Sequence, residues 1–131
     1  MNLNKVQLIG RLGKPPEIKT MADGDKIATI ALATSESWKD KITNEWKDKT
    51  EWHKIVAFGF NAEKAEKMAK GALVYIEGQL QTRKWTDSNG VDKYTTEIVL
   101  QKFNGTLKGL EKNITTNHSE VANNMNDDIP F

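Results

Sequence analysis

Most of the chain alternates apolar and polar residues in short runs, which is the pattern of half-buried β-strands. Turn residues divide it into five such runs, at residues 3–12, 26–38, 50–60, 72–85 and 91–101. The breaks carry Pro, Gly, Asp and Asn, the residues that favour tight turns. Between the second and third runs, the charged segment 39–49 is expected to form an exposed hairpin loop.

One segment has helical spacing instead, directly after the third run. Its narrow apolar stripe is formed by Ala62, Ala65, Met68 and Ala69. Asn61 is expected to cap the first turn and Gly71 to end the helix. A helix of about ten residues is not stable alone, so it must pack on the strands. Five strands with one short helix between the third and fourth predict an all-β protein, a five-stranded OB-fold barrel.

Two glycines lie at the end of the first strand, Gly10 within it and Gly13 directly after it. A glycine pair of this kind is a weak sign of a phosphate-binding loop, because the full glycine pattern is missing and no helix follows. Backbone bending of a barrel strand is the better interpretation.

The composition changes after Gly109. Residues 113–131 are rich in Asn and contain no Lys or Arg, which predicts a disordered, flexible tail on a domain formed by residues 1–112. The tail ends in two acids, an apolar residue, a rigid proline and a terminal phenylalanine, namely Asp127, Asp128, Ile129, Pro130 and Phe131. This peptide suits an apolar pocket with a basic rim. The alternative is a frayed end whose apolar residues are accidental.

Composition excludes several classes of protein. The 131 residues include no Cys and only two His, so disulfides, zinc–cysteine sites and thiol nucleophiles are absent and no metal site is expected. No nucleophile and base stand together, so we expect no catalytic residue, cofactor or small-molecule substrate. The sequence shows neither an apolar run of membrane-spanning length nor a signal peptide, so we expect no membrane partner and a cytoplasmic location.

The net charge of +1 conceals an uneven distribution. All 19 Lys and Arg residues lie within residues 1–112 together with 15 acids, which gives this part +4. The other three acids give the tail −3. The predicted barrel is therefore mildly basic, and the tail is acidic.

Aromatic and basic residues share strand faces. In the third strand Trp52, Lys54 and Phe58 point to one side, and His53 to the other. The fourth strand ends in Arg83-Lys84-Trp85. Aromatic side chains stack on any base, and Lys and Arg contact phosphate, so the pattern indicates binding of single-stranded nucleic acid.

The alternative for each aromatic is a place in the core. Trp38, Trp46 and Trp85 have charged neighbours in sequence. Burying charge is costly, which favours exposure of these three rings.

Seven stretches together resemble the bacterial single-stranded DNA-binding protein family. They are residues 10–17 (GRLGKPPE), 33–38 (ATSESW), 50–53 (TEWH), 75–80 (YIEGQL), 82–87 (TRKWTD), 94–97 (YTTE) and 127–131 (DDIPF). They occur in the family's order from end to end. The resemblance implies a homotetramer that wraps single-stranded DNA in replication, recombination and repair, in the bacterial cytoplasm at the nucleoid.

The resemblance also implies roles for single residues. The base-stacking positions are Trp38, Trp52, Phe58 and Trp85, and the basic positions are Lys5, Lys54, Lys70, Arg83 and Lys84. Arg11 stands where Asn is usual and adds a cation, while Trp46 is an additional aromatic. His53 and Tyr75 are implied at subunit interfaces. The last five residues are implied to dock replication and repair proteins.

Two other functions use the same residues. The first is binding of RNA or structured nucleic acid by the same barrel. The second is an interaction scaffold, in which the tail is the functional part and the barrel only presents it. Competition between DNA and RNA separates the first from DNA binding, and deletion of the last five residues separates the second.

Overall fold

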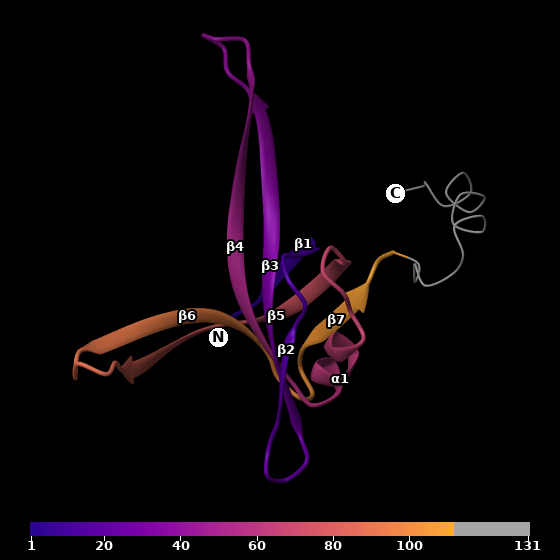
Figure 1. Ribbon diagram of the computed structural model, residues 1–131, viewed down its shortest axis with the longest axis vertical. Helices are drawn as coiled ribbons and strands as arrows, with labels where there is room; N and C mark the ends of the chain where they lie inside the picture. Colours follow the sequence, from indigo (N-terminus) through magenta and orange to yellow (C-terminus); the bar gives the residue numbers. More distant parts are fainter. Residues whose placement is uncertain (112–131) are drawn as a thin grey trace.

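The computed structural model describes residues 1–111 (Figure 1). It contains β1 (Val6–Leu12), β2 (Glu17–Thr20), β3 (Lys26–Lys39), β4 (Trp46–Phe58), α1 (Phe60–Glu66), β5 (Leu73–Thr86), β6 (Asp92–Leu100) and β7 (Thr106–Gly109). The predicted tail, including its last five residues, lies outside the described residues. The division of the chain at residue 112 therefore stays a prediction.

Five strands close into a barrel. β1 pairs with β3, β3 with β4, β4 with β6, β6 with β5, and β5 with β1 again. All of these pairs are antiparallel except β4–β6, which is parallel at Ile55↔Ile98 and its two neighbouring pairs. The predicted five-stranded barrel, with its helix between the third and fourth barrel strands, is confirmed. Two short strands that the sequence pattern did not predict extend it, β2 beside β3 and β7 beside β5.

Alternate residues of the barrel strands fill the core. The largest fully buried side chains are Leu12, Ile30, Leu32, Ile55, Ile76, Leu100, Leu107 and Val74. The helix adds the buried Ala62 and Ala65, with Met68 packed at the edge. The first half of the predicted stripe is therefore confirmed, whereas Met68 and Ala69 lie after the helix and Ala69 is exposed. Leu80 shares its strand side with the buried Ile76 but is 51% exposed, because β5 extends beyond the core at this point.

The ends of α1 differ from the prediction. The helix begins at Phe60 after Gly59, whose φ of 63° lies in the left-handed region that favours glycine. Asn61 is inside the first turn and buried, and its amide donates a hydrogen bond to the Gly105 carbonyl oxygen at 2.9 Å. Asn61 therefore joins the helix to the loop before β7 instead of capping it. Glu66 ends the helix five residues before Gly71.

The segment predicted as a loop, residues 39–49, is strand at both of its ends. β3 and β4 stay paired as far as Lys39↔Trp46, so the turn itself is only residues 40–45. Beyond the barrel the two strands form a long hairpin, the arm, comprising residues 35–50 (Figure 1). Hydrogen bonds between Ser35 and Thr50 and between Ser37 and Asp48 cross it. The arm thus projects side chains well away from the core.

Gly10 of β1 and Gly13, which directly follows this strand, lie against different partners. A Cβ atom on buried Gly10 would lie 2.3 Å from the Ala33 carbonyl oxygen of β3. Gly10 lies where β1 turns from β5 toward β3, which agrees with a role in bending the strand. A Cβ atom on Gly13 would instead lie 2.2 Å from the Trp52 ring. Gly10 thus permits barrel closure, and Gly13 provides the place for an aromatic ring.

Candidate nucleic-acid interface

The outward side of β4, β6 and β5 includes tryptophans and cations from two of the three strands. β4 contributes Trp52 and Lys54, and β5 contributes Arg83 and Trp85. Their alternate neighbours face the core, as the burial of Ile55 shows. We call this surface the outer face.

Both rings of the outer face are accessible. Trp52 is 61% exposed and Trp85 is 42% exposed. The indole Nε1 of Trp85 donates a hydrogen bond to Thr95 Oγ1 at 2.7 Å, which holds the ring against β6. The Trp52 ring lies directly against Gly13, where the absence of a side chain leaves room for it. The rings are therefore positioned on the surface and not buried, as the sequence pattern indicated.

A buried carboxylate lies between the two cations. Glu97 of β6 is only 6% exposed, and its Oε1 accepts a hydrogen bond from Arg83 Nε at 3.1 Å. Its Oε2 is 3.5 Å from Lys54 Nζ and has no hydrogen-bond partner. Sequence reasoning missed Glu97, although it precedes the buried run 98–100, where an acid is unusual.

Trp46 and Trp38 lie on opposite sides of the arm. Trp46 shares the strand side of Trp52 and Lys54, since all three occupy alternate positions of β4. Trp38 pairs with Lys47 and so points to the opposite side of the arm. Both are exposed, Trp46 by 71% and Trp38 by 44%. The structure therefore places Trp46, and not Trp38, in line with the outer face.

Phe58 lies apart from the tryptophans at the other end of β4. It is half-buried and lines a cavity of about 330 Å³ together with Met21, Lys26 and Lys102. The cavity lies between the β2–β3 turn and the end of β6. By alternation along β4, Phe58 shares the strand side of Trp52 and Lys54, and its role in binding stays a prediction.

Three further predicted cations are already paired. Lys5 Nζ lies 2.9 Å from Glu77, Arg11 lies 3.0 Å from Glu111, and Lys84 lies 3.3 Å from Asp92. A bound phosphate must compete with these carboxylates. Lys70 is exposed on the segment that joins α1 to β5.

The carboxylates of two of these pairs titrate below their usual range. A hydrogen bond from Tyr75, followed by one from Lys5, lowers the pKa of Glu77. A hydrogen bond from Arg11 lowers the pKa of Glu111. The hydrogen bond to Glu77 raises the pKa of Lys5. Both carboxylates therefore stay ionised at neutral pH.

The two residues predicted at subunit interfaces make contacts within the chain. His53 is half-buried, and its Nε2 lies 2.8 Å from Thr34 Oγ1. The Tyr75 hydroxyl donates to Glu77 at 2.7 Å and accepts a hydrogen bond from Gln7 at 2.9 Å. An interface role for either residue stays a prediction.

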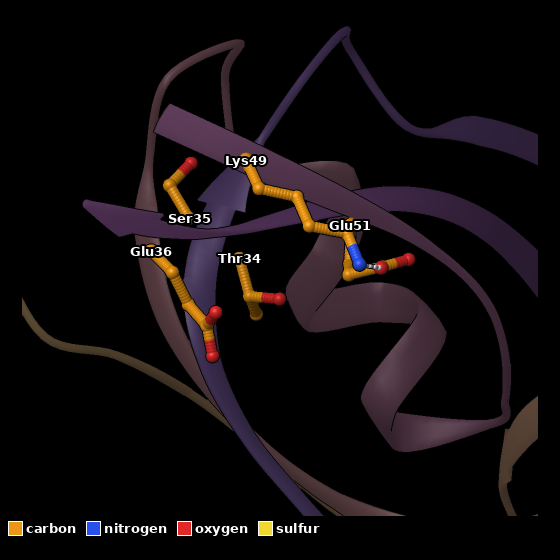
Figure 2. Close-up of a pocket in the computed structure, with 5 residues that line it drawn as sticks. All are labelled: Thr34, Ser35, Glu36, Lys49 and Glu51. Carbon is orange, nitrogen blue, oxygen red and sulfur yellow. Dashed lines mark ion pairs between the residues drawn. The ribbon is translucent and has the colours of Figure 1, made fainter. Parts of the chain in front are cut away.

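A small polar pocket lies where the arm leaves the barrel. Its volume is about 240 Å³, and its lining residues are Thr34, Ser35, Glu36, Lys49 and Glu51. Figure 2 shows the Lys49 side chain lying along the pocket, with its amine 3.1 Å from the Glu51 carboxylate. Two acids with one paired lysine do not suit phosphate. Within residues 1–111 there is no group of three potential His, Asp or Glu metal ligands, and no helix has the length and apolarity to cross a membrane.

Comparison with known proteins gives consistent results. The model of the Single-strand binding protein family matches residues 3–105. The chain is 50% identical over 121 residues to a single-stranded DNA-binding protein of Rickettsia felis, covering 91% of this chain and 80% of the relative. It is 45% identical over 149 residues to that of Rickettsia typhi, covering 99% and 98%.

Two solved structures are also similar. A Plasmodium falciparum SSB complex with ssDNA has a TM-score of 0.73 and 47% sequence identity, with 85% of this chain and 97% of that chain covered. A deletion mutant of the single-stranded DNA binding protein from Thermus aquaticus has a TM-score of 0.66 and 25% identity, with 84% and 51% covered.

Proposed function

Because this chain belongs to the Single-strand binding protein family, we propose that it binds single-stranded DNA without sequence preference and thereby protects it. The family assignment agrees with the prediction of a binding protein and not an enzyme. The observation that carries the proposal is the outer face, where exposed Trp52 and Trp85 stand beside Lys54 and Arg83.

The outer face suits a single strand for a physical reason. Stacking a base on Trp requires a free base face, which a duplex hides and a single strand offers. Every base has such a face, so stacking tolerates any sequence. Lys54 is two residues from Trp52 on β4, and Arg83 is two residues from Trp85 on β5, so each cation is placed to contact the phosphates of bases stacked on the neighbouring ring. Phosphate contacts release counter-ions, so affinity falls as salt rises.

The wider proposal includes the remaining predictions. Trp38, Phe58 and Trp46 add aromatic surface, and Lys5, Arg11, Lys70 and Lys84 add positive charge. The chain acts as a homotetramer in replication, recombination and repair, with His53 and Tyr75 near subunit contacts. The proposed location is the bacterial cytoplasm, in association with the nucleoid.

Titration of the intrinsic Trp fluorescence tests the proposal directly. Oligo-dT is expected to quench the emission at low salt, and added NaCl is expected to restore it. A competing RNA oligomer of matched length should restore little of the emission, and equal competition would favour the RNA-binding alternative. Absence of quenching at low salt would contradict base stacking.

The proposed role of the tail is tested by deleting residues 127–131. We expect DNA affinity to change little, because the outer face is intact, while capture of replication and repair enzymes from a bacterial extract is lost. The control removes residues 119–123, which shortens the tail equally and keeps its end. Affinity chromatography with mass spectrometry measures capture. If DNA binding disappears with residues 127–131, the docking role is wrong.

A further inference from the structure

We propose that Glu97 is an internal counter-ion of the DNA-binding surface, which neutralises part of the charge of Lys54 and Arg83 until phosphate replaces it. The inference rests on the proposed function. In that function Glu97 limits the affinity for single-stranded DNA, whereas the aromatic and basic residues provide this affinity.

The position of Glu97 supports this role. β6 lies between β4 and β5, so its outward side chains lie between those of Lys54 and Arg83. Both cations remain accessible above it, with 42% and 48% of their side chains exposed, while Glu97 is 6% exposed. A strand of DNA on this surface therefore meets the two cations and not the carboxylate.

The charges of this cluster do not balance. One carboxylate faces two cations, so the cluster carries one net positive charge. Burial of a carboxylate is unfavourable unless opposite charges and hydrogen bonds compensate it. Arg83 makes a hydrogen bond to one oxygen, but Lys54 at 3.5 Å from the other compensates it by charge alone. Lys54 is therefore drawn toward the sheet, and a bound phosphate must compete with Glu97 for it.

The opposite interpretation is that Glu97 aligns the two cations for DNA. Removal of its charge would then weaken binding. On the counter-ion interpretation the same change strengthens binding, because both cations become available to phosphate. The two interpretations thus predict effects of opposite sign for one substitution.

The test is Glu97→Gln in the full chain, with affinity for a dT oligomer measured between 50 and 200 mM NaCl. The amide keeps the shape and can still accept a hydrogen bond from Arg83. We expect binding at low salt to become about two- to fivefold tighter, the range of one exposed ion pair. The slope of log affinity against log salt should become more negative by up to about 0.7, the value for one further phosphate of a single strand.

The matched control is Glu66→Gln. This change removes the charge of Glu66, the last residue of α1, which forms an ion pair with Lys26 of β3 away from the outer face. Its affinity and salt slope should equal those of the wild type. In a Lys54→Met background, the gain from Glu97→Gln should shrink, because one of the two released cations is missing. Melting temperatures establish that each variant is folded.

A second measurement uses a variant in which the buried Glu97 is unchanged. Lys54→Met alone should reduce the salt slope by less than about 0.7, since the lysine is already partly neutralised. Unchanged or weaker DNA binding by the Glu97→Gln variant would overturn the inference. A reduction of the salt slope by the full value of about 0.7 in the Lys54→Met variant would overturn it as well. If the wild type itself does not bind dT, the proposed function fails, and that result is distinct from a failure of the counter-ion role.

Discussion

Trp52→Ala is expected to weaken binding of a dT oligomer by about 5- to 150-fold, which corresponds to the loss of about 1–3 kcal/mol of base stacking. Trp52 is 61% exposed, and Gly13 leaves room for its ring, so the truncation removes contact surface without opening the core. Fluorescence anisotropy of a labelled oligomer at fixed salt measures the change.

The loss should be similar for dT, dC and dA oligomers, because stacking uses a face that all bases share. A loss confined to one base would contradict the mechanism. Phe103→Ala is the matched control. Phe103 is also an exposed aromatic residue beside a cation, Lys102, but it lies in the β6–β7 loop, outside the outer face. Its truncation should leave affinity unchanged.

Gly10→Ala is expected to lower the free energy of unfolding by about 1–3 kcal/mol, the usual cost of adding atoms to a packed site. The new Cβ atom would lie 2.3 Å from the Ala33 carbonyl oxygen, and backbone of a neighbouring strand moves only at the expense of the barrel. This cost exceeds the gain of about 0.4–1 kcal/mol from the stiffer unfolded chain. Urea unfolding followed by circular dichroism measures it.

Gly13→Ala makes the same chemical change three residues away and serves as the comparison. Its Cβ atom would meet the Trp52 ring, an exposed side chain that is free to turn away. Stability should therefore change little, while DNA affinity falls because the ring is displaced. Equal losses of stability in the two variants would contradict this difference between a backbone contact at Gly10 and a side-chain contact at Gly13.

The barrel could be predicted from sequence because its strands are long and each alternates in the expected way. Ile55 and Ala57 are buried on one side of β4, while Trp52 and Lys54 are exposed on the other. The helix was found by the same means, through Ala62 and Ala65. Its first residue was not, because Gly59 caps the helix by conformation and not through a side chain.

The elements that were missed have weak local signals. β2 and β7 have four residues each, and β7 buries only Leu107, so neither shows a periodicity. Their strand state depends on pairing with β3 and β5, which is a property of the folded barrel. Both extend the barrel without changing its order.

The contents of the site were predicted better than its arrangement. Exposure of Trp38, Trp46 and Trp85 followed from their charged neighbours. The opposite directions of Trp38 and Trp46 depend on the register of the arm, and the role assigned to Glu97 depends on neighbours from β4 and β5. The cations that surround Glu97 are 14 and 43 positions away in the chain, so no local pattern contains this cluster.

The arm also has a consequence for the dynamics of the molecule. Its side chains are exposed on both sides, and cross-strand polar contacts take the place of an apolar layer. A two-stranded ribbon without a core is marginally stable, whereas the barrel opens only when its buried layer is lost. The arm therefore unfolds locally at a lower free energy than the barrel. A ligand that lies along it orders it, and part of the binding free energy is spent on that ordering.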